Sequence, residues 1–511
     1  MAFKTFAAIH VGSGEASMRI YEISQKKGIQ LLDFVRSGIE LGSDTYRDGY
    51  ISHEAVHELC TILKGFVLKM QEYGITEYAA YGSSALKEAE NYHLIIDQIL
   101  LKTGLHLTVI DNARQRYLIL KSIAAGMNNF DQLLSEGTLI LDMGSGSMQL
   151  TLYDSGRMVY TQHLKLGALR VLEMLSSVRS HVTQFNAVMD DYIGNDIDTI
   201  SRLFLSNYSV GHMIIAGEEI MSVLRVLGSA SEKAFLTRQQ FEDLCGRILS
   251  SSPEQLSADY HIPYDQAALL EPAVLIYRKL ASVTGAGKIW MTDAGLCDGM
   301  AVDYANTTLK IHKGHHFADD MAVYAREIAR RYHSGGKHSS NVEQLALAIF
   351  DGIKKQSGLM KRERLLLQLS CILHDCGKYM SIGDSAYYSF QIVMANEFLG
   401  LSEAERSIVA DAVYYNGKTD FPARSELLAP LGDGDYILML KLAAILYVAN
   451  ILDRSHRQKI RDLSITLKEK EMIIRADTIY DITLEQEILD RRSEFFESIY
   501  GYEPVLRSKR R

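Results

Sequence analysis

Cysteine is scarce in this chain, and no two cysteines are spaced as a CxxC pair. Their number is odd, so they do not make a complete disulfide framework; they are Cys60, Cys245, Cys297, Cys371 and Cys376. Free, buried thiols are typical of a reducing compartment. The sequence therefore predicts a cytoplasmic protein.

Long apolar segments are missing as well. The N-terminal run MAFKTFAAIH contains one lysine and no extended apolar core, so we expect no signal peptide. The most apolar segment, residues 436–452, includes Lys441 and Asn450. It falls short of the roughly 18 uninterrupted apolar residues expected of a membrane span. We interpret it as a buried helix and expect no membrane partner.

An excess of positive charge is absent too, because 54 Lys and Arg face 63 Asp and Glu, giving a net charge of -9. This balance argues against general binding of DNA or RNA. We interpret the basic end, residues 507–511, as a solvated tail. With 47% apolar and 23% charged residues the composition is that of a globular protein, and 511 residues require several domains.

One short phrase occurs twice, as IHVGSG at residues 9–14 and as LDMGSG at residues 141–146, each time between two strand-like runs. A tight Gly/Ser turn exposes backbone N–H groups that can surround a phosphate. The two turns therefore predict a phosphate clamp formed by Gly12, Ser13, Gly14, Gly144, Ser145, Gly146 and Ser147. The alternative is a pair of ordinary hairpin turns. The copies differ where the second has Asp142 and the first has His10.

The order of predicted elements divides the chain into four domains. Strands alternate with helices over 1–125 and again over 126–308, which predicts an α/β fold made of two similar halves. Amphipathic helical runs fill 315–458, after a linker segment KGHH that contains Gly314. Residues 459–511 contain two strand-like runs, 463–469 and 471–477, and a helical run, and predict a small α/β module.

Further phrases follow the turns in a fixed order: AYGSSALKEAEN at 80–91, LGALR at 166–170, DAGLCDG at 293–299 and a late His-Asp pair. With these the chain resembles the exopolyphosphatase/guanosine pentaphosphate phosphohydrolase (Ppx/GppA) family over nearly its whole length. The resemblance implies two actin-like (sugar kinase/Hsp70-type) domains, an all-helical HD-like domain and a small α/β tail. It also implies removal of the terminal phosphate from inorganic polyphosphate or pppGpp with Mg²⁺, and it is compatible with a homodimer.

The chain departs from the family pattern at three carboxylate positions. His10 and Gln149 replace two of them, and Arg114 stands where the resemblance places the catalytic Glu. Only Asp142 remains as a Mg²⁺ ligand. Arginine cannot accept a proton near neutral pH, so either Asp111 substitutes as the base or the site only binds. Arg114 itself could clamp a phosphate or pair with a surface carboxylate. Two functions stay open: a hydrolase, or an impaired member that binds polyphosphate or (p)ppGpp as a sensor or scaffold.

The HD-like part offers three of the four residues that hold a divalent metal in HD hydrolases, namely His338, His374 and Asp375, with Asn450 in the fourth position. They either bind a metal or hold helices together by hydrogen bonds. The resemblance also implies contacts with polyphosphate, for which the candidates are Arg454, His456, Arg457 and Lys459. The alternative for these four is ordinary charge at a helix end.

Overall fold

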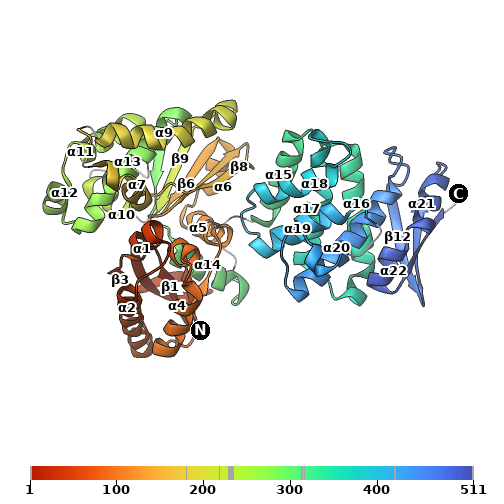
Figure 1. Ribbon diagram of the computed structural model, residues 1–511, viewed down its shortest axis with the longest axis horizontal. Coiled ribbons are helices and arrows are strands. Elements are labelled where there is room, and N and C mark those ends of the chain that lie inside the picture. Colours follow the sequence, from red (N-terminus) through yellow and green to blue (C-terminus); the bar gives the residue numbers. More distant parts are fainter. Residues whose placement is uncertain are drawn as a thin grey trace. The chain divides into compact units, whose positions relative to one another are not determined.

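The computed structural model describes residues 3–179, 181–183, 185–217, 219–227, 235–311, 315, 317–418 and 422–508. The chain forms two compact units, Met1–His316 and Phe317–Arg511, which we describe separately (Figure 1). The predicted linker glycine, Gly314, and the last three residues of the basic tail lie outside the described residues. The finer divisions at 125 and 458 stay predictions.

The first half of the first unit is a five-stranded sheet in the order β3-β2-β1-β4-β5. As the first phrase predicts, β1 and β2 form an antiparallel hairpin around the first Gly/Ser turn, whereas β4 and β5 are parallel to β1. The strands are β1 (Lys4–Val11), β2 (Glu15–Ser24), β3 (Gly28–Gly38), β4 (Tyr78–Gly82) and β5 (Thr108–Val109). The helices are α1 (Leu41–Asp48), α2 (His53–Glu72), α3 (Ser84–Glu88) and α4 (Tyr92–Thr103).

The second half repeats this plan with a six-stranded sheet in the order β10-β11-β9-β6-β7-β8. Its β6–β7 hairpin encloses the second Gly/Ser turn, and α9 and α13 pack together against the sheet (Figure 1). The strands are β6 (Thr138–Met143), β7 (Met148–Asp154), β8 (Arg157–Leu164), β9 (His212–Gly217), β10 (Leu236–Thr237) and β11 (Lys288–Met291). The helices are α5 (Asn112–Gly126), α6 (Phe130–Ser135), α7 (Ala168–Met174), α8 (Ser176–Arg179), α9 (Phe185–Leu203), α10 (Ile220–Leu227), α11 (Arg238–Leu249), α12 (Pro253–Tyr260), α13 (Tyr264–Thr284) and α14 (Leu296–Thr307).

Helix α14 crosses between the two halves. It follows β11 in the sequence, and we expected it to belong to the second repeat, yet it packs on β1, β2 and β3 and against α5. Gly299 makes the contact with α5 possible, because a Cβ atom there would lie 2.1 Å from the carbonyl oxygen of Leu118. The absence of a side chain lets the two helix backbones approach closely.

Replacing Gly299 by alanine is expected to destabilise the first unit by about 1–3 kcal/mol, because the added methyl group forces α5 and α14 apart. Gly246, in helix α11, is the matched control because nothing lies within 4 Å of the position that a Cβ atom would take there. Gly246→Ala is expected to stabilise the protein by about 0.5–1 kcal/mol through helix propensity. Denaturant unfolding followed by the fluorescence of the single tryptophan, Trp290 in β11, measures both changes. Equal effects of the two substitutions would contradict the close packing.

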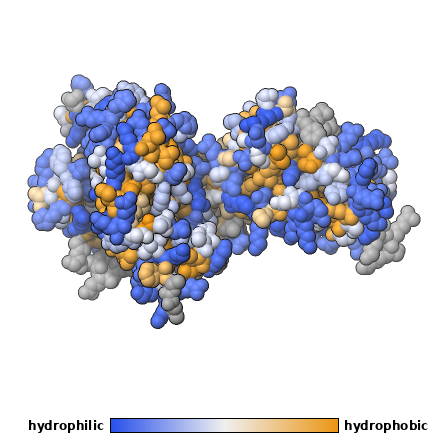
Figure 2. Space-filling model, turned by 90° about the horizontal axis from the view of Figure 1, so that it is seen from below, coloured by the Kyte–Doolittle hydropathy of each residue, from blue (hydrophilic) through white to orange (hydrophobic). Residues whose placement is uncertain are grey.

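The second unit begins with a bundle of helices, as its amphipathic runs predict. Figure 2 shows that the visible face of the molecule is largely hydrophilic, with its apolar residues in separate groups.

Helix α20 contains the apolar segment 436–452. Among the described residues it is the one helix long and apolar enough to cross a membrane. Within the protein, 67% of its most apolar 18-residue window is buried. The helices are α15 (Phe317–Arg331), α16 (Lys337–Ser357), α17 (Lys361–Leu373), α18 (Ser385–Ala395), α19 (Glu403–Tyr415) and α20 (Asp433–Leu452).

The C-terminal module confirms the two expected strands, β12 (Asp462–Lys468) and β13 (Glu471–Asp477), but differs at its end. The single helical run is two helices, α21 (Thr483–Arg491) and α22 (Glu494–Tyr500). A third strand, β14 (Glu503–Ser508), pairs in parallel with β13. The first residues of the basic tail, Arg507 and Ser508, therefore belong to a strand but are exposed, as expected, and Arg507 pairs with Glu471 at 3.2 Å.

Asp411 of α19 is a fully buried carboxyl group, and burial raises its pKa from 3.8 to about 7, an effect that nearby backbone amides only partly offset. Because the folded state holds this proton more tightly, stability falls as the pH rises from about 4 to about 7 and stays low above that. Between pH 5.5 and pH 8 the free energy of unfolding of the wild type should fall by about 2 kcal/mol. The Asp411→Asn variant should not show this fall, because asparagine does not bind the proton. Scanning calorimetry at both values tests this, with the exposed Asp384→Asn as control. Parallel pH dependence of wild type and Asp411→Asn would contradict it.

Candidate functional site

The two Gly/Ser turns lie against one another in the first unit. Each is closed by a backbone hydrogen bond, from Gly12 to Glu15 at 2.8 Å and from Gly144 to Ser147 at 2.9 Å. A Cβ atom on Gly14 would lie 3.5 Å from the hydroxyl oxygen of Ser145. The structure therefore brings together the turns that the sequence singled out.

Hydroxyl groups from α1 and α3 fill the space beside the first turn. The hydroxyl of Ser13 contacts those of Tyr46 at 2.6 Å and Ser84 at 3.1 Å. Gly146 of the second turn packs against the same Tyr46 hydroxyl so closely that a Cβ would lie 1.9 Å from it. Of the seven turn residues predicted to clamp a phosphate, only Gly144 lines the neighbouring pocket.

Five separate stretches of the sequence border this pocket. They are the consecutive strands β1, β2 and β3, one face of α5, the end of β6, the end of β9, and the loop from β11 into the start of α14. Gly217 closes one wall, where its φ of 141° and a Cβ position 1.9 Å from the carbonyl oxygen of Met143 require glycine. The polar and charged side chains in the lining are His10, Glu15, Ser17, Arg19, Arg36, Gln115, Arg116, Asp142 and Asp293.

The three carboxylates of the pocket differ in their surroundings. Asp142 accepts a hydrogen bond from Arg116 at 2.6 Å, in a pair whose side chains are only 8% and 3% exposed, and Glu15 is paired with Arg36. Asp293 is exposed, and its carboxylate has no polar partner within the described part of the chain. Asp293 is thus the carboxylate of the lining whose oxygens are accessible to a molecule in the pocket. Oxygen atoms from Asp142 and Asp293 are also donors of the kind that Mg²⁺ prefers.

Helix α5 turns a different face to the pocket than the sequence indicated. Arg114 does not line the pocket; its guanidinium pairs with Asp303 at 2.7 Å, so it does not hold a phosphate there in this structure. The next two residues, Gln115 and Arg116, line the pocket instead. Consecutive helix residues point about 100° apart, so moving along by one or two residues decides which side chain reaches a ligand.

The remaining substituted or alternative positions of the first unit have structural contacts. Asp111 is the N-cap of α5, where its carboxylate accepts a hydrogen bond from the backbone N–H of Arg114 at 2.7 Å. Gln149 is buried, and its amide donates to the hydroxyl of Thr161 at 2.7 Å. Neither side chain lines the pocket. His10 does, and its Nε2 lies 3.1 Å from the hydroxyl of Ser83.

The sequence positions of two pocket residues, Glu15 and Asp293, indicate that they lie near a ligand site. Glu15 immediately follows the first Gly/Ser turn, and Asp293 begins the phrase DAGLCDG at the end of β11. Ligands in open α/β sheets lie beyond the carboxyl ends of the strands, so the position of Asp293 after a strand was informative. The position of Arg116 was not, because it depends on how α5 packs.

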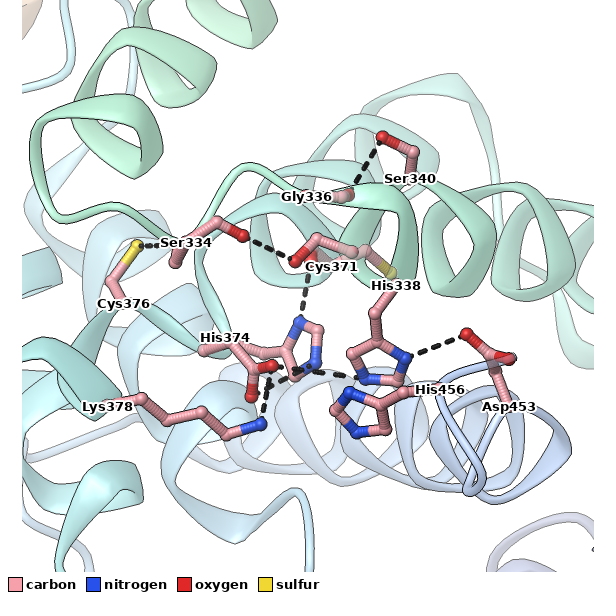
Figure 3. Close-up of polar contacts among 12 residues, drawn as sticks. Ser334, Gly336, His338, Ser340, Cys371, His374, Cys376, Lys378, Asp453 and His456 are labelled. Carbon is pink, nitrogen blue, oxygen red and sulfur yellow. Dashed lines mark hydrogen bonds and ion pairs between the residues drawn. The ribbon is translucent and has the colours of Figure 1, made fainter. Parts of the chain in front are cut away.

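The second unit gathers His338, His374 and Asp375 (Figure 3). Their potential ligand atoms lie within 4.8 Å of one another. Nε2 of His374 is 3.4 Å from the carboxylate of Asp375, and Nε2 of His338 is 3.9 Å from it. The structure thus brings together the three residues that the sequence proposed as metal ligands.

Hydrogen bonds determine that Nδ1 of each of the two histidines carries a hydrogen. Nδ1 of His338 lies 2.8 Å from the carboxylate of Asp453, and Nδ1 of His374 lies 2.8 Å from the carbonyl oxygen of Cys371. Because these oxygens only accept, each Nδ1 carries a hydrogen. Burial also lowers the pKa of His374, which keeps it neutral. Although burial alone would raise the pKa of Asp375, the nearby His374 and Lys378 lower it overall, so this carboxylate is ionised.

The basic candidates near this cluster have different surroundings. Arg454, His456 and Arg457 are exposed, and the ring of His456 stacks on that of His338 with centroids 3.6 Å apart (Figure 3). Lys459 instead binds Glu485 at 3.2 Å and the carbonyl oxygen of Asp481, which is a structural contact with α21.

Two residues that contact the cluster were not predicted. Asp453, three residues after the proposed Asn450, has its carboxylate 2.8 Å from Nδ1 of His338. Lys378 binds Asp375 at 2.7 Å. The register at the end of α20, which decides between Asn450 and Asp453, cannot be read from sequence spacing alone.

Comparison with known proteins shows the family to which the chain belongs. The model of the Ppx/GppA phosphatase family matches residues 19–308, and the model of domain III of the Ppx/GppA phosphatases matches residues 323–494. The chain belongs to the Ppx/GppA phosphatase family. Membership supports a phosphatase function.

Individual relatives are distant. The chain is 20% identical over 482 residues to a guanosine-5'-triphosphate,3'-diphosphate pyrophosphatase of Photobacterium profundum, covering 92% of this chain and 91% of that protein. It is 22% identical over 173 residues to a bifunctional 3-dehydroquinate synthase/phosphatase of Fusobacterium nucleatum, covering 33% of this chain and only 26% of that protein. The crystal structure of an exopolyphosphatase from Cytophaga hutchinsonii, 19% identical, covers 59% of this chain and 97% of its own, with a TM-score of 0.51. This likeness confirms the actin-like fold.

Proposed function

We propose that the first unit hydrolyses the terminal phosphoanhydride bond of inorganic polyphosphate or of a guanosine polyphosphate such as pppGpp, with Mg²⁺, in the cytoplasm. The observation that carries the proposal is the pocket beside the paired Gly/Ser turns, which combines three arginines with an unpaired carboxylate. Arginine recognises phosphate oxygens well. Family membership supports the same chemistry.

In this mechanism Asp293 removes a proton from a water molecule, the water oxygen attacks the terminal phosphorus, and the bond to the bridging oxygen breaks. Arg36 and Arg116 line the pocket where they offset negative charge on the phosphates. Asp142 would hold Mg²⁺ together with phosphate oxygens and water; the ion would supply further charge stabilisation when bound. The backbone N–H groups of the turns remain candidates for phosphate contacts.

The proposal covers the partners as well. Exposed Arg454, His456 and Arg457 of the second unit are candidates for binding polyphosphate. No nucleic acid and no membrane is needed for this function, and a homodimer is compatible with it.

The test measures phosphate release from polyphosphate and from pppGpp, with Mg²⁺ and with a chelator, alongside binding of the same ligands. We expect multiple turnovers that stop when Mg²⁺ is removed. Protein carrying Asp142→Asn, purified in the same way, controls for a contaminating hydrolase. Tight binding without turnover would contradict the hydrolase and favour the sensor or scaffold.

A further inference from the structure

We infer that His338, His374 and Asp375 bind one divalent transition-metal ion, and that the open positions on this ion take a phosphate anion beside Lys378. The site belongs to the second unit and is separate from the pocket proposed for hydrolysis. The three side chains come from the start of α16 and from the turn that follows α17. Figure 3 shows the imidazole rings of His338 and His374 close to one another. The carboxylate of Asp375 lies 3.4 Å from Nε2 of His374 and 3.9 Å from Nε2 of His338.

The first argument is a pair of buried nitrogen atoms that lack partners. Nε2 of His338 and Nε2 of His374 are both buried, and neither has a hydrogen-bond partner among the described residues. With hydrogen on each Nδ1, the neutral form of each ring has its lone pair on Nε2, next to the carboxylate of Asp375. Unpaired buried acceptors destabilise a fold, and a cation at their meeting point satisfies all three groups at once.

The second argument is the support behind His338. Asp453 is 1% exposed, and its carboxylate also accepts from the backbone N–H of Gln458 at 2.8 Å. His456 and Gln458 have φ values of 54° and 48°, in the left-handed region that is uncommon for such residues. This unusual backbone brings a second donor to Asp453. A carboxylate that orients a histidine through Nδ1 is the usual outer partner of a metal-bound imidazole, so we assign Asp453 as a positioning residue.

The donor set decides the class of metal. Two imidazole nitrogens suit Zn²⁺, Co²⁺ and related ions, whereas Mg²⁺ and Ca²⁺ prefer oxygen ligands throughout. Three protein ligands leave at least one position open for water or an anion. Lys378 now binds Asp375 at 2.7 Å, and its side chain is 41% exposed. A metal ion would displace Lys378 from Asp375, and the freed ammonium group then faces an anion on the metal.

The test uses the full chain, stripped of metal with a chelator and titrated calorimetrically with Zn²⁺, Co²⁺ or Mg²⁺. We expect one equivalent of Zn²⁺ or Co²⁺ to bind to this site and Mg²⁺ not to compete for it at equal concentration. Visible absorption of bound Co²⁺ reports its ligands, and inorganic phosphate is expected to change that spectrum. These measurements do not depend on phosphate release, so failure of the hydrolase proposal would leave them unaffected.

Variants separate the metal site from a structural cluster. Asp375→Asn is expected to abolish the Co²⁺ spectrum, and Asp453→Asn to weaken binding by about 10–100-fold. Lys378→Met is expected to bind the metal more tightly but to lose the response to phosphate. His57→Ala, an exposed histidine of α2 in the other unit, is the control and should match the wild type. Circular dichroism verifies that each variant is folded.

The outcomes are decisive in both directions. Absence of Zn²⁺ and Co²⁺ binding in the wild type, or equal binding by folded Asp375→Asn, would overturn the metal site. A Co²⁺ spectrum that phosphate leaves unchanged would overturn the anion site. Equal affinity of Asp453→Asn and wild type would overturn the positioning role.

Discussion

Replacing Asp293 by asparagine is expected to lower the rate of phosphate release by about 100- to 10,000-fold, the usual contribution of a general base. The reason is the contrast among the three carboxylates of the pocket. Glu15 and Asp142 are each paired with an arginine, and a carboxylate so paired accepts a proton less readily. Asp293 has no such partner in the described structure and is exposed to the pocket.

Steady-state kinetics with polyphosphate and with pppGpp measures this effect. We expect the loss in kcat with a smaller change in KM, because asparagine cannot accept the proton of the attacking water. Asp259→Asn is the matched control, an exposed aspartate on α12 away from the pocket lining. An Asp293→Asn variant whose kcat stays within a few fold of the wild type would exclude Asp293 as the base.

The sequence was sufficient for the features that depend on local pattern. The repeated phrase predicted both hairpins, because a Gly/Ser turn between strand-like runs specifies the turn and the pairing together. Alternating and amphipathic runs likewise predicted the two α/β halves and the helical bundle. The grouping of His338 with His374 and Asp375 also followed from the resemblance, although His338 lies in α16 and the adjacent His374 and Asp375 follow α17.

Features that depend on packing between elements were not predicted. Gln115 and Arg116, rather than Arg114, reach the pocket because α5 is oriented by its close contact with α14 at Gly299. That contact joins residues nearly 200 positions apart, and no local pattern encodes it. For the same reason the sequence did not reveal that α14 covers the first sheet. Strand β14 was missed because its short segment pairs only through β13.

Breaking the buried ion pair between Arg116 and Asp142 is expected to cause a large loss of stability. Asp142→Asn leaves the guanidinium of Arg116 without its counter-charge at a site where its side chain is only 3% exposed. Removing one partner of a buried ion pair typically costs about 3–5 kcal/mol. Unfolding in denaturant, followed through Trp290, measures this loss. The control is Asp198→Asn, which breaks an exposed pair with Lys279 and should cost at most about 1 kcal/mol.

A double variant separates the stability of this pair from its proposed part in binding phosphate. Arg116→Met with Asp142→Leu replaces both charges by apolar groups, which is often close to neutral for stability. It also removes the pocket's buried arginine and the one carboxylate retained from the family pattern. We therefore expect a variant nearly as stable as the wild type that neither binds nor hydrolyses polyphosphate. A stable double variant with wild-type turnover would show that this pair is needed neither for stability nor for hydrolysis, and would leave Arg36 and the two turns as the candidates for phosphate contacts.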